Sequence, residues 1–183
     1  MAMASNGPDL ISALLADHNA VKQLFGRFDA DGASRAELFC ELTNELVRHE
    51  VAEEEVLYPE VRSALPNGDQ LADARIDEQS EAEEALAELE KMDPKSAGFG
   101  AKLAQLQSDV LAHAEHEEQE VFAPLRSAVD LAHLELLGGL YEKAKASAPT
   151  HPHPHAPDTP PGNLVLGPVA ALVDRMRDAI RGA

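Results

Sequence analysis

The chain has 183 residues, of which 33 are Asp or Glu and 15 are Lys or Arg, so its formal net charge is -18. So acidic a surface repels nucleic-acid phosphates and anionic lipid, and we expect neither nucleic acid nor membrane as a partner. The single cysteine, Cys40, cannot form an internal disulfide, and the sequence has neither a signal-peptide pattern nor an apolar run of about 20 residues. We therefore expect a soluble, cytoplasmic protein.

Apolar residues recur at helical spacing in four segments that are separated by turn residues. The segments are residues 8–28, a stretch from the N-cap candidate Ser34 to the turn at 66–68, residues 69–92, and a stretch from 103 that Pro124 kinks or ends. One more short helix is expected at 131–146. Four amphipathic helices with short connections each bury one stripe, so we predict an all-α, up-down-up-down four-helix bundle at 8–146.

The composition changes after Ala148. Residues 147–162 are rich in proline and histidine, which favours an extended linker. The alternating His151, His153 and His155 could bind a transition metal loosely, but a linker is the more common role of such a run. Residues 163–183 predict an amphipathic helix with three arginines against two aspartates, which either docks on the bundle or binds a protein partner.

Histidine and glutamate interrupt the apolar stripes where the core of the bundle is expected. His18 lies between apolar residues of the first helix, and the pairs His49/Glu53 and His113/Glu117 repeat the same spacing near the ends of two other helices. Residues at i and i+4 share a helix face, so each pair points into the bundle. A buried carboxylate is costly unless it is paired or bound to metal, and a cation supplies the missing charge.

A lone histidine on an apolar face is usually an ordinary core residue, but two repeated pairs together with His18 predict a metal site. Nitrogen and oxygen donors without thiolate suit iron, manganese or zinc rather than Cu(I) or an iron–sulfur cluster. Five such donors exceed the need of one tetrahedral zinc. Two metals bridged by Glu53 and Glu117 would use all of them.

These motifs resemble the hemerythrin-like HHE cation-binding family over about residues 9–146. The first-helix histidine is followed by two H-x-x-x-E-E segments, which end near Tyr58-Pro59 and Phe122-Ala123-Pro124. The resemblance implies a centre of two non-haem iron ions that meets O2, NO or peroxide; one iron, or manganese or zinc, are the alternatives. The ligands that it implies are His18, His49, Glu53, His113 and Glu117.

The third helix departs from the family pattern, because Gln79 stands where a histidine is expected. Glutamine is a poor iron ligand, so a mononuclear or weakly metallated site is an alternative. Glu83, one turn on, or Tyr58, at the end of the second helix, could substitute. Glu83 also fits a solvated helix face, and Tyr58 lies away from the direction of Glu53 in an ideal helix, so it requires local unwinding before Pro59.

The donor set also bears on function. Few imidazoles and many oxygen donors stabilise ferric iron, and a ferric site releases O2 poorly. We therefore favour sensing of O2, NO or iron, or peroxide- or NO-linked redox chemistry, over reversible O2 transport. The contrasting interpretation is an iron-sensing or iron-storing module without catalysis, and whether the chain is an enzyme stays open at this point.

Overall fold

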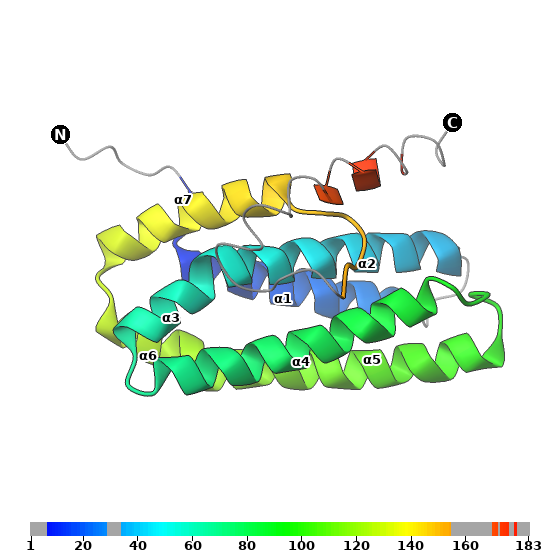
Figure 1. Cartoon of the computed structure of the whole chain (residues 1–183), viewed down its shortest axis with the longest axis horizontal. Helices are drawn as coiled ribbons and strands as arrows, with labels where there is room; N and C mark the ends of the chain where they lie inside the picture. Colours follow the sequence, from blue (N-terminus) through cyan, green and yellow to red (C-terminus); the bar gives the residue numbers. More distant parts are fainter. Residues whose placement is uncertain (1–6, 29–33, 155–169, 172, 176–177, 179–183) are drawn as a thin grey trace.

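The computed structural model describes residues 7–28, 34–154, 170–171, 173–175 and 178, and its regular structure there is helical throughout (Figure 1). Four long helical runs form the predicted bundle, with α4 packed on α5, α1 packed on α2, and α7 lying against both α1 and α2. The helices in chain order are α1 (Leu10–Arg27), α2 (Arg35–Ala52), α3 (Tyr58–Ala64), α4 (Gly68–Leu89), α5 (Ala97–His116), α6 (Ala123–Ala128) and α7 (Leu131–Ser147). The predicted all-α bundle with an additional helix is confirmed.

Polar side chains define where the helices begin. Asp9, Ser34, Ser96 and Asp130 each accept a hydrogen bond from the backbone N–H three residues on, which satisfies one of the free donors of a helix N-terminus. Before α4, Asn67 adopts a left-handed backbone with φ 59° and so closes the turn that the sequence predicts at 66–68.

The helix widens into a π-helical turn at two equivalent places, η1 (Glu53–Leu57) and η2 (Glu117–Phe122). Each turn starts at the glutamate of a His/Glu pair and is followed by a proline, Pro59 or Pro124. A proline lacks the N–H and crowds the carbonyl group four residues back, so the regular α-helical pattern cannot pass through it. The chain responds with a wider turn instead of a break, and such turns are frequent at functional sites.

The bundle core consists of two apolar clusters with a polar layer between them. One cluster contains the apolar residues of α1 from Leu10 to Leu14 and apolar residues of η1, α3 and α7. The other contains Phe25 of α1, Leu42 of α2, Leu86 of α4, Phe99 of α5 and further apolar residues of these helices. In α1, α2 and α4 the residues of this polar layer also lie between the two sets in sequence. The buried polar layer contains His18, His49, Glu53, Gln79 and Glu117.

The chain turns back from α7 toward α4 after Ala148, and the segment up to Pro154 runs between α2 and α4 (Figure 1). The rest of the predicted linker and most of the predicted helix at 163–183 lie outside the described residues. Residues 170–171, 173–175 and 178 are helical, and Ala171 and Asp174 are buried. Within the described part of the chain, no helix combines the length and the apolarity needed to cross a membrane.

Candidate metal centre

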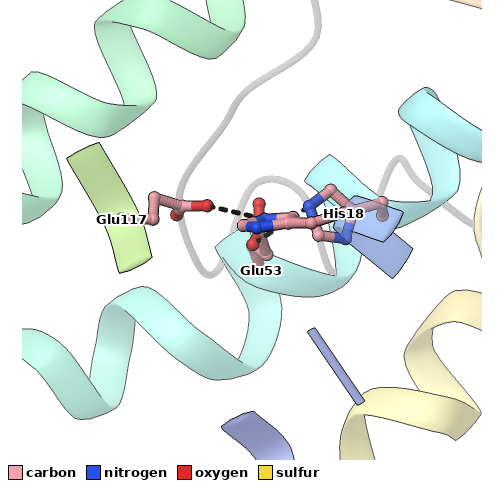
Figure 2. A group of neighbouring side chains, drawn as sticks. His18, Glu53 and Glu117 are labelled. Atoms are coloured by element: carbon pink, nitrogen blue, oxygen red, sulfur yellow. Dashed lines mark ion pairs between the residues drawn. The ribbon is translucent and has the colours of Figure 1, made fainter. Parts of the chain in front are cut away.

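Four helical elements bring potential metal ligands to one point in the middle of the bundle. His18 of α1, His49 of α2, Glu53 of η1 and Glu117 of η2 each offer a ligand atom, and these atoms lie within 4.8 Å of one another. All four side chains are buried, and the two carboxylates are fully inaccessible. Figure 2 shows His18, Glu53 and Glu117 pointing toward one another. Of the predicted ligands, the structure therefore brings these four together, and His113 of α5 joins them through Glu117.

The distances between donors fit ligands that share a cation. His18 Nε2 and His113 Nε2 lie 3.3 and 3.4 Å from Glu117 Oε2, and His49 Nε2 lies 3.2 Å from Glu53 Oε1. Two donors that each lie about 2.1 Å from one ion are about 3.0 Å apart at 90° and about 3.4 Å apart at the tetrahedral angle.

Four of these five donor atoms also lack hydrogen-bond partners. They are His18 Nε2, His113 Nε2, Glu53 Oε1 and Glu117 Oε2, and each is shielded from solvent. Unpartnered buried polar atoms are rare and costly in native proteins, so four of them around one point need an explanation. A bound cation supplies one, and the residues present fit a metal.

His49 is oriented by a chain of hydrogen bonds on the side away from the centre. The Tyr141 hydroxyl donates to Asp17 Oδ2 at 2.6 Å, so its oxygen can accept from His49 Nδ1–H at 2.7 Å. Burial lowers the pKa of His49 and favours the neutral ring. A neutral ring that donates through Nδ1 directs the Nε2 lone pair at the centre, which is the tautomer that a metal ligand needs.

The other two histidines are oriented in the same way by carboxylates. His18 Nδ1 lies 3.0 Å from Glu118 Oε1, and His113 Nδ1 lies 2.9 Å from Glu78 Oε2. Each ring therefore donates outward through Nδ1 and presents Nε2 inward, as metal-binding histidines commonly do. The sequence analysis did not assign a role to these outer partners, although Glu118 directly follows Glu117.

The two carboxylates of the centre differ in charge when no metal is bound. Burial raises the pKa of Glu53 well above its usual range, and the charges of Glu117 and Glu50 raise it further. For Glu117, burial acts in the same direction, but the charges of His113 and His18 outweigh it and lower the pKa to about 2. Glu53 is thus neutral and Glu117 ionised, and a metal that binds both must displace a proton.

The three weaker ligand candidates occupy different places. Gln79 is buried, donates from Nε2 to Glu53 Oε2 at 2.6 Å, and leaves its own Oε1 without a partner. Tyr58 is buried and donates to Glu117 Oε1 at 2.9 Å. The π-helical turn η1 supplies the local unwinding that this position requires. Glu83 accepts a hydrogen bond from the backbone of His153 and is not part of the donor group.

Sequence reasoning missed Glu50, a carboxylate that is only 7% exposed. It lines a cavity beside the donors together with His18, His49 and Gln79, and the volume open to the centres of water-sized molecules is about 20 Å³. Burial raises the pKa of Glu50 well above its usual range, and the charge of Glu83 adds to the effect. The residue directly follows a histidine on an inward face, so its position in the helix alone does not predict its burial.

The remaining histidines and Cys40 lie outside the centre. His116 is exposed and contacts Glu78, His133 contacts Glu60, and Cys40 is exposed. His151 contacts Glu90 and Asp178, the ring of His153 contacts Asp174, and His155 lies outside the described residues.

Known proteins are similar to this chain over most of its helical bundle. The model of the hemerythrin HHE cation-binding domain matches residues 9–125. An uncharacterized hemerythrin-like protein of Schizosaccharomyces pombe is 32% identical over 135 residues, which are 73% of this chain and 66% of that protein. A DNA nickase of Nostoc is 33% identical over 132 residues, which are 71% of this chain and 37% of that protein. The chain thus spans at most about two thirds of these relatives.

A solved structure supports the fold. The crystal structure of a hemerythrin HHE cation-binding domain-containing protein from Mycobacterium kansasii superimposes with a TM-score of 0.65 and 23% identity, covering 77% of this chain and 90% of that one. Residues 9–125, which the family model matches, contain all five predicted ligands and both π-helical turns. The chain belongs to the hemerythrin HHE cation-binding domain family.

Proposed function

We propose that the chain binds non-haem iron in two unequal positions and uses it to react with or to sense O2, NO or peroxide. The observation that carries the proposal is the division of the donors into two groups. His18, His113 and Glu117 meet at one carboxylate oxygen, while His49 and Glu53 meet at another. Two imidazoles and one carboxylate are the donor set typical of non-haem Fe(II), so the first group is the tighter iron position.

The second position has fewer nitrogen donors. Among the described residues, His49 is the imidazole that meets Glu53, Gln79 Nε2 donates to Glu53 Oε2, and Glu50 lines the adjacent cavity with His49 and Gln79. Oxygen donors stabilise ferric iron and leave Fe(II) more weakly held. Two irons therefore bind with different affinities, and the second is the one that Gln79 in place of a histidine weakens.

The size of the cavity restricts the external ligand. About 20 Å³ accommodates one water-sized molecule, which suits O2, NO or peroxide better than an organic substrate. When bound, iron supplies the redox chemistry, and the chain's own residues exclude bulk water and hold the three imidazoles through their Nδ1 hydrogen bonds. An oxygen-rich donor set favours sensing or peroxide- and NO-linked redox chemistry over O2 transport.

DNA nicking is not part of the proposal. The nickase is matched over 37% of its length, and a net charge of -18 disfavours contact with a polyanion.

Iron content per chain, after anaerobic loading with Fe(II) and removal of weakly held metal, tests the proposal. The wild type is expected to bind two irons with separable affinities, His113→Ala to lose the tighter one, and Glu53→Gln to lose the weaker one. His133→Ala removes a histidine with only one carboxylate contact, outside the centre, and is the matched control. Absorption changes on addition of peroxide or NO then identify the ligand. Equal loss of both irons in every variant, control included, contradicts the assignment.

A further inference from the structure

A second group of histidines and carboxylates joins the C-terminal part of the chain to α4. We call residues 147–154 the strap, and the helical residues 170–171, 173–175 and 178 the arm. The ring of His151, which is only 6% exposed, lies between Glu90, the C-cap residue of α4, and Asp178 of the arm. His151 Nδ1 is 2.5 Å from Glu90 Oε1, and His151 Nε2 is 2.8 Å from Asp178 Oδ1.

These two short contacts determine the charge of the ring. A neutral imidazole has one N–H, so it can donate to only one of two carboxylates, whereas an imidazolium donates to both. The metal centre differs, because there the inward nitrogens of His18 and His113 lie 3.3 and 3.4 Å from a carboxylate oxygen and make no hydrogen bond. His151 is therefore held by protons rather than by a shared cation.

The arm approaches α4 with charges of the same sign. Asp174 is fully buried, and its Oδ2 accepts from the backbone N–H groups of Thr150 and His151 and lies 3.0 Å from His153 Nε2. The backbone N–H of His153 donates to Glu83 Oε1 of α4 at 2.6 Å. Docking thus gathers two aspartates of the arm near two glutamates of α4, and their mutual repulsion has to be offset by positive charge between them.

We propose that His151 is a proton-controlled latch that holds the strap and the arm against α4, beside the metal centre. The titratable groups around His151 are Glu90 at the C-cap of α4, Asp178 and Asp174 of the arm, and Cys40 of α2, which lines a pocket together with Glu90 and His151. The latch is linked to the metal centre through Glu83. The backbone N–H of His153 in the strap donates to Glu83, and the negative charge of Glu83 raises the pKa of Glu50 in the cavity beside the centre.

The direction of the pH dependence follows from these contacts. Burial opposes protonation of His151, but the hydrogen bonds to Glu90 and Asp178 outweigh it and raise the pKa above 6.5. Docking is therefore complete below the ordinary histidine pKa and weakens as the pH rises through the raised value.

The test measures the latch in the metal-free full-length chain in the presence of EDTA, so it does not depend on the proposed iron chemistry. Nuclear magnetic resonance gives the His151 pKa, and hydrogen exchange gives the protection of the Thr150, His151 and His153 amides from about pH 6 to about pH 9. We expect a raised pKa and at least tenfold loss of protection as the pH passes through it. Glu90→Gln and Asp178→Asn should each lower the pKa and reduce the protection at about pH 6.

Glu60→Gln is the matched control, because it removes the carboxylate that contacts the His133 ring and should leave the strap unchanged. The far-ultraviolet circular dichroism of each variant reports whether the bundle is intact. Protection that is independent of pH, or a His151 pKa that Glu90→Gln and Asp178→Asn leave unchanged, overturns the proposal. Protection that appears only when zinc replaces EDTA also overturns it, because the strap would then be a metal site.

Discussion

Replacing Glu53 by glutamine should stabilise the metal-free protein and, at the same time, weaken metal binding. Glu53 is fully buried, and burial together with the charge of Glu117 raises its pKa. The new amide can accept from Gln79 Nε2, now 2.6 Å away, and can donate to the lone pair of His49 Nε2, now 3.2 Å from the carboxylate. The substitution removes a buried carboxyl group and leaves its neighbours hydrogen-bonded.

The size of the effect follows from the cost of keeping a buried carboxyl group protonated when the unfolded chain ionises it. Each pH unit above the ordinary carboxyl pKa costs about 1.4 kcal/mol, so the substitution removes a cost of roughly 1–4 kcal/mol near neutral pH. For a chain of this length, each kcal/mol raises Tm by about 2–4 °C, so the increase should be about 2–16 °C. The assay is thermal and urea unfolding after exhaustive chelation, with metal affinity measured separately by competition with a chelator.

Glu117→Gln is the matched comparison, and we expect the opposite sign in the metal-free protein. Glu117 is ionised and faces His18 Nε2 and His113 Nε2, so its loss leaves buried imidazoles without their counter-charge. Destabilisation of up to about 3–5 kcal/mol is expected for breaking such a group. Both variants should lose metal affinity. If Glu53→Gln destabilises the chelated protein, or if both variants change stability in the same direction, the description of the centre is wrong.

Three other predictions follow from contacts around the bundle. Tyr141→Phe removes a hydroxyl that orients a ligand histidine, so metal affinity measured against a chelator should fall about 10–100-fold; an unchanged affinity would contradict that role. Gly138→Ala places a Cβ 2.3 Å from a backbone oxygen and should cost about 1–3 kcal/mol in thermal unfolding, whereas Gly139→Ala, with nothing within 4 Å, should be neutral or stabilising. Asp9→Ala removes the α1 cap at a cost of about 0.5–2 kcal/mol. Burial raises the pKa of Asp9, but the hydrogen bonds from Ser12 outweigh burial and lower this pKa below 3.8. The stability difference between the wild type and Asp9→Ala should therefore be complete at neutral pH and shrink as the pH falls below 3.8.

Much of the fold and part of the centre could be predicted from local patterns. Helical periodicity and turn residues predicted four long helical runs, since burial of one stripe per helix is a local property of the sequence. The i, i+4 spacing of His49/Glu53 and His113/Glu117 predicted inward-facing pairs for the same reason, and the structure places them at mid-bundle.

Other features depended on residues that are distant in sequence. Tyr141 and Asp17 are 124 residues apart, and only the packing of α7 on α1 brings them together behind His49. The burial of Glu50 depends on neighbouring helices, because its own helix position does not point at the centre.

The turn before Pro59 and the strap also separate what the sequence predicts from what only the packing of distant elements decides. The sequence alone determined that this protein is a helical bundle with paired His and Glu residues on inward faces, since both follow from spacing within a single helix. Only the tertiary structure decided that the chain passes Pro59 through a π-helical turn, which brings the Tyr58 hydroxyl to Glu117, and that His151 lies between two carboxylates. The physical reason is that hydrogen bonding and desolvation of a side chain depend on which elements pack around it, and spacing along one helix does not contain that information.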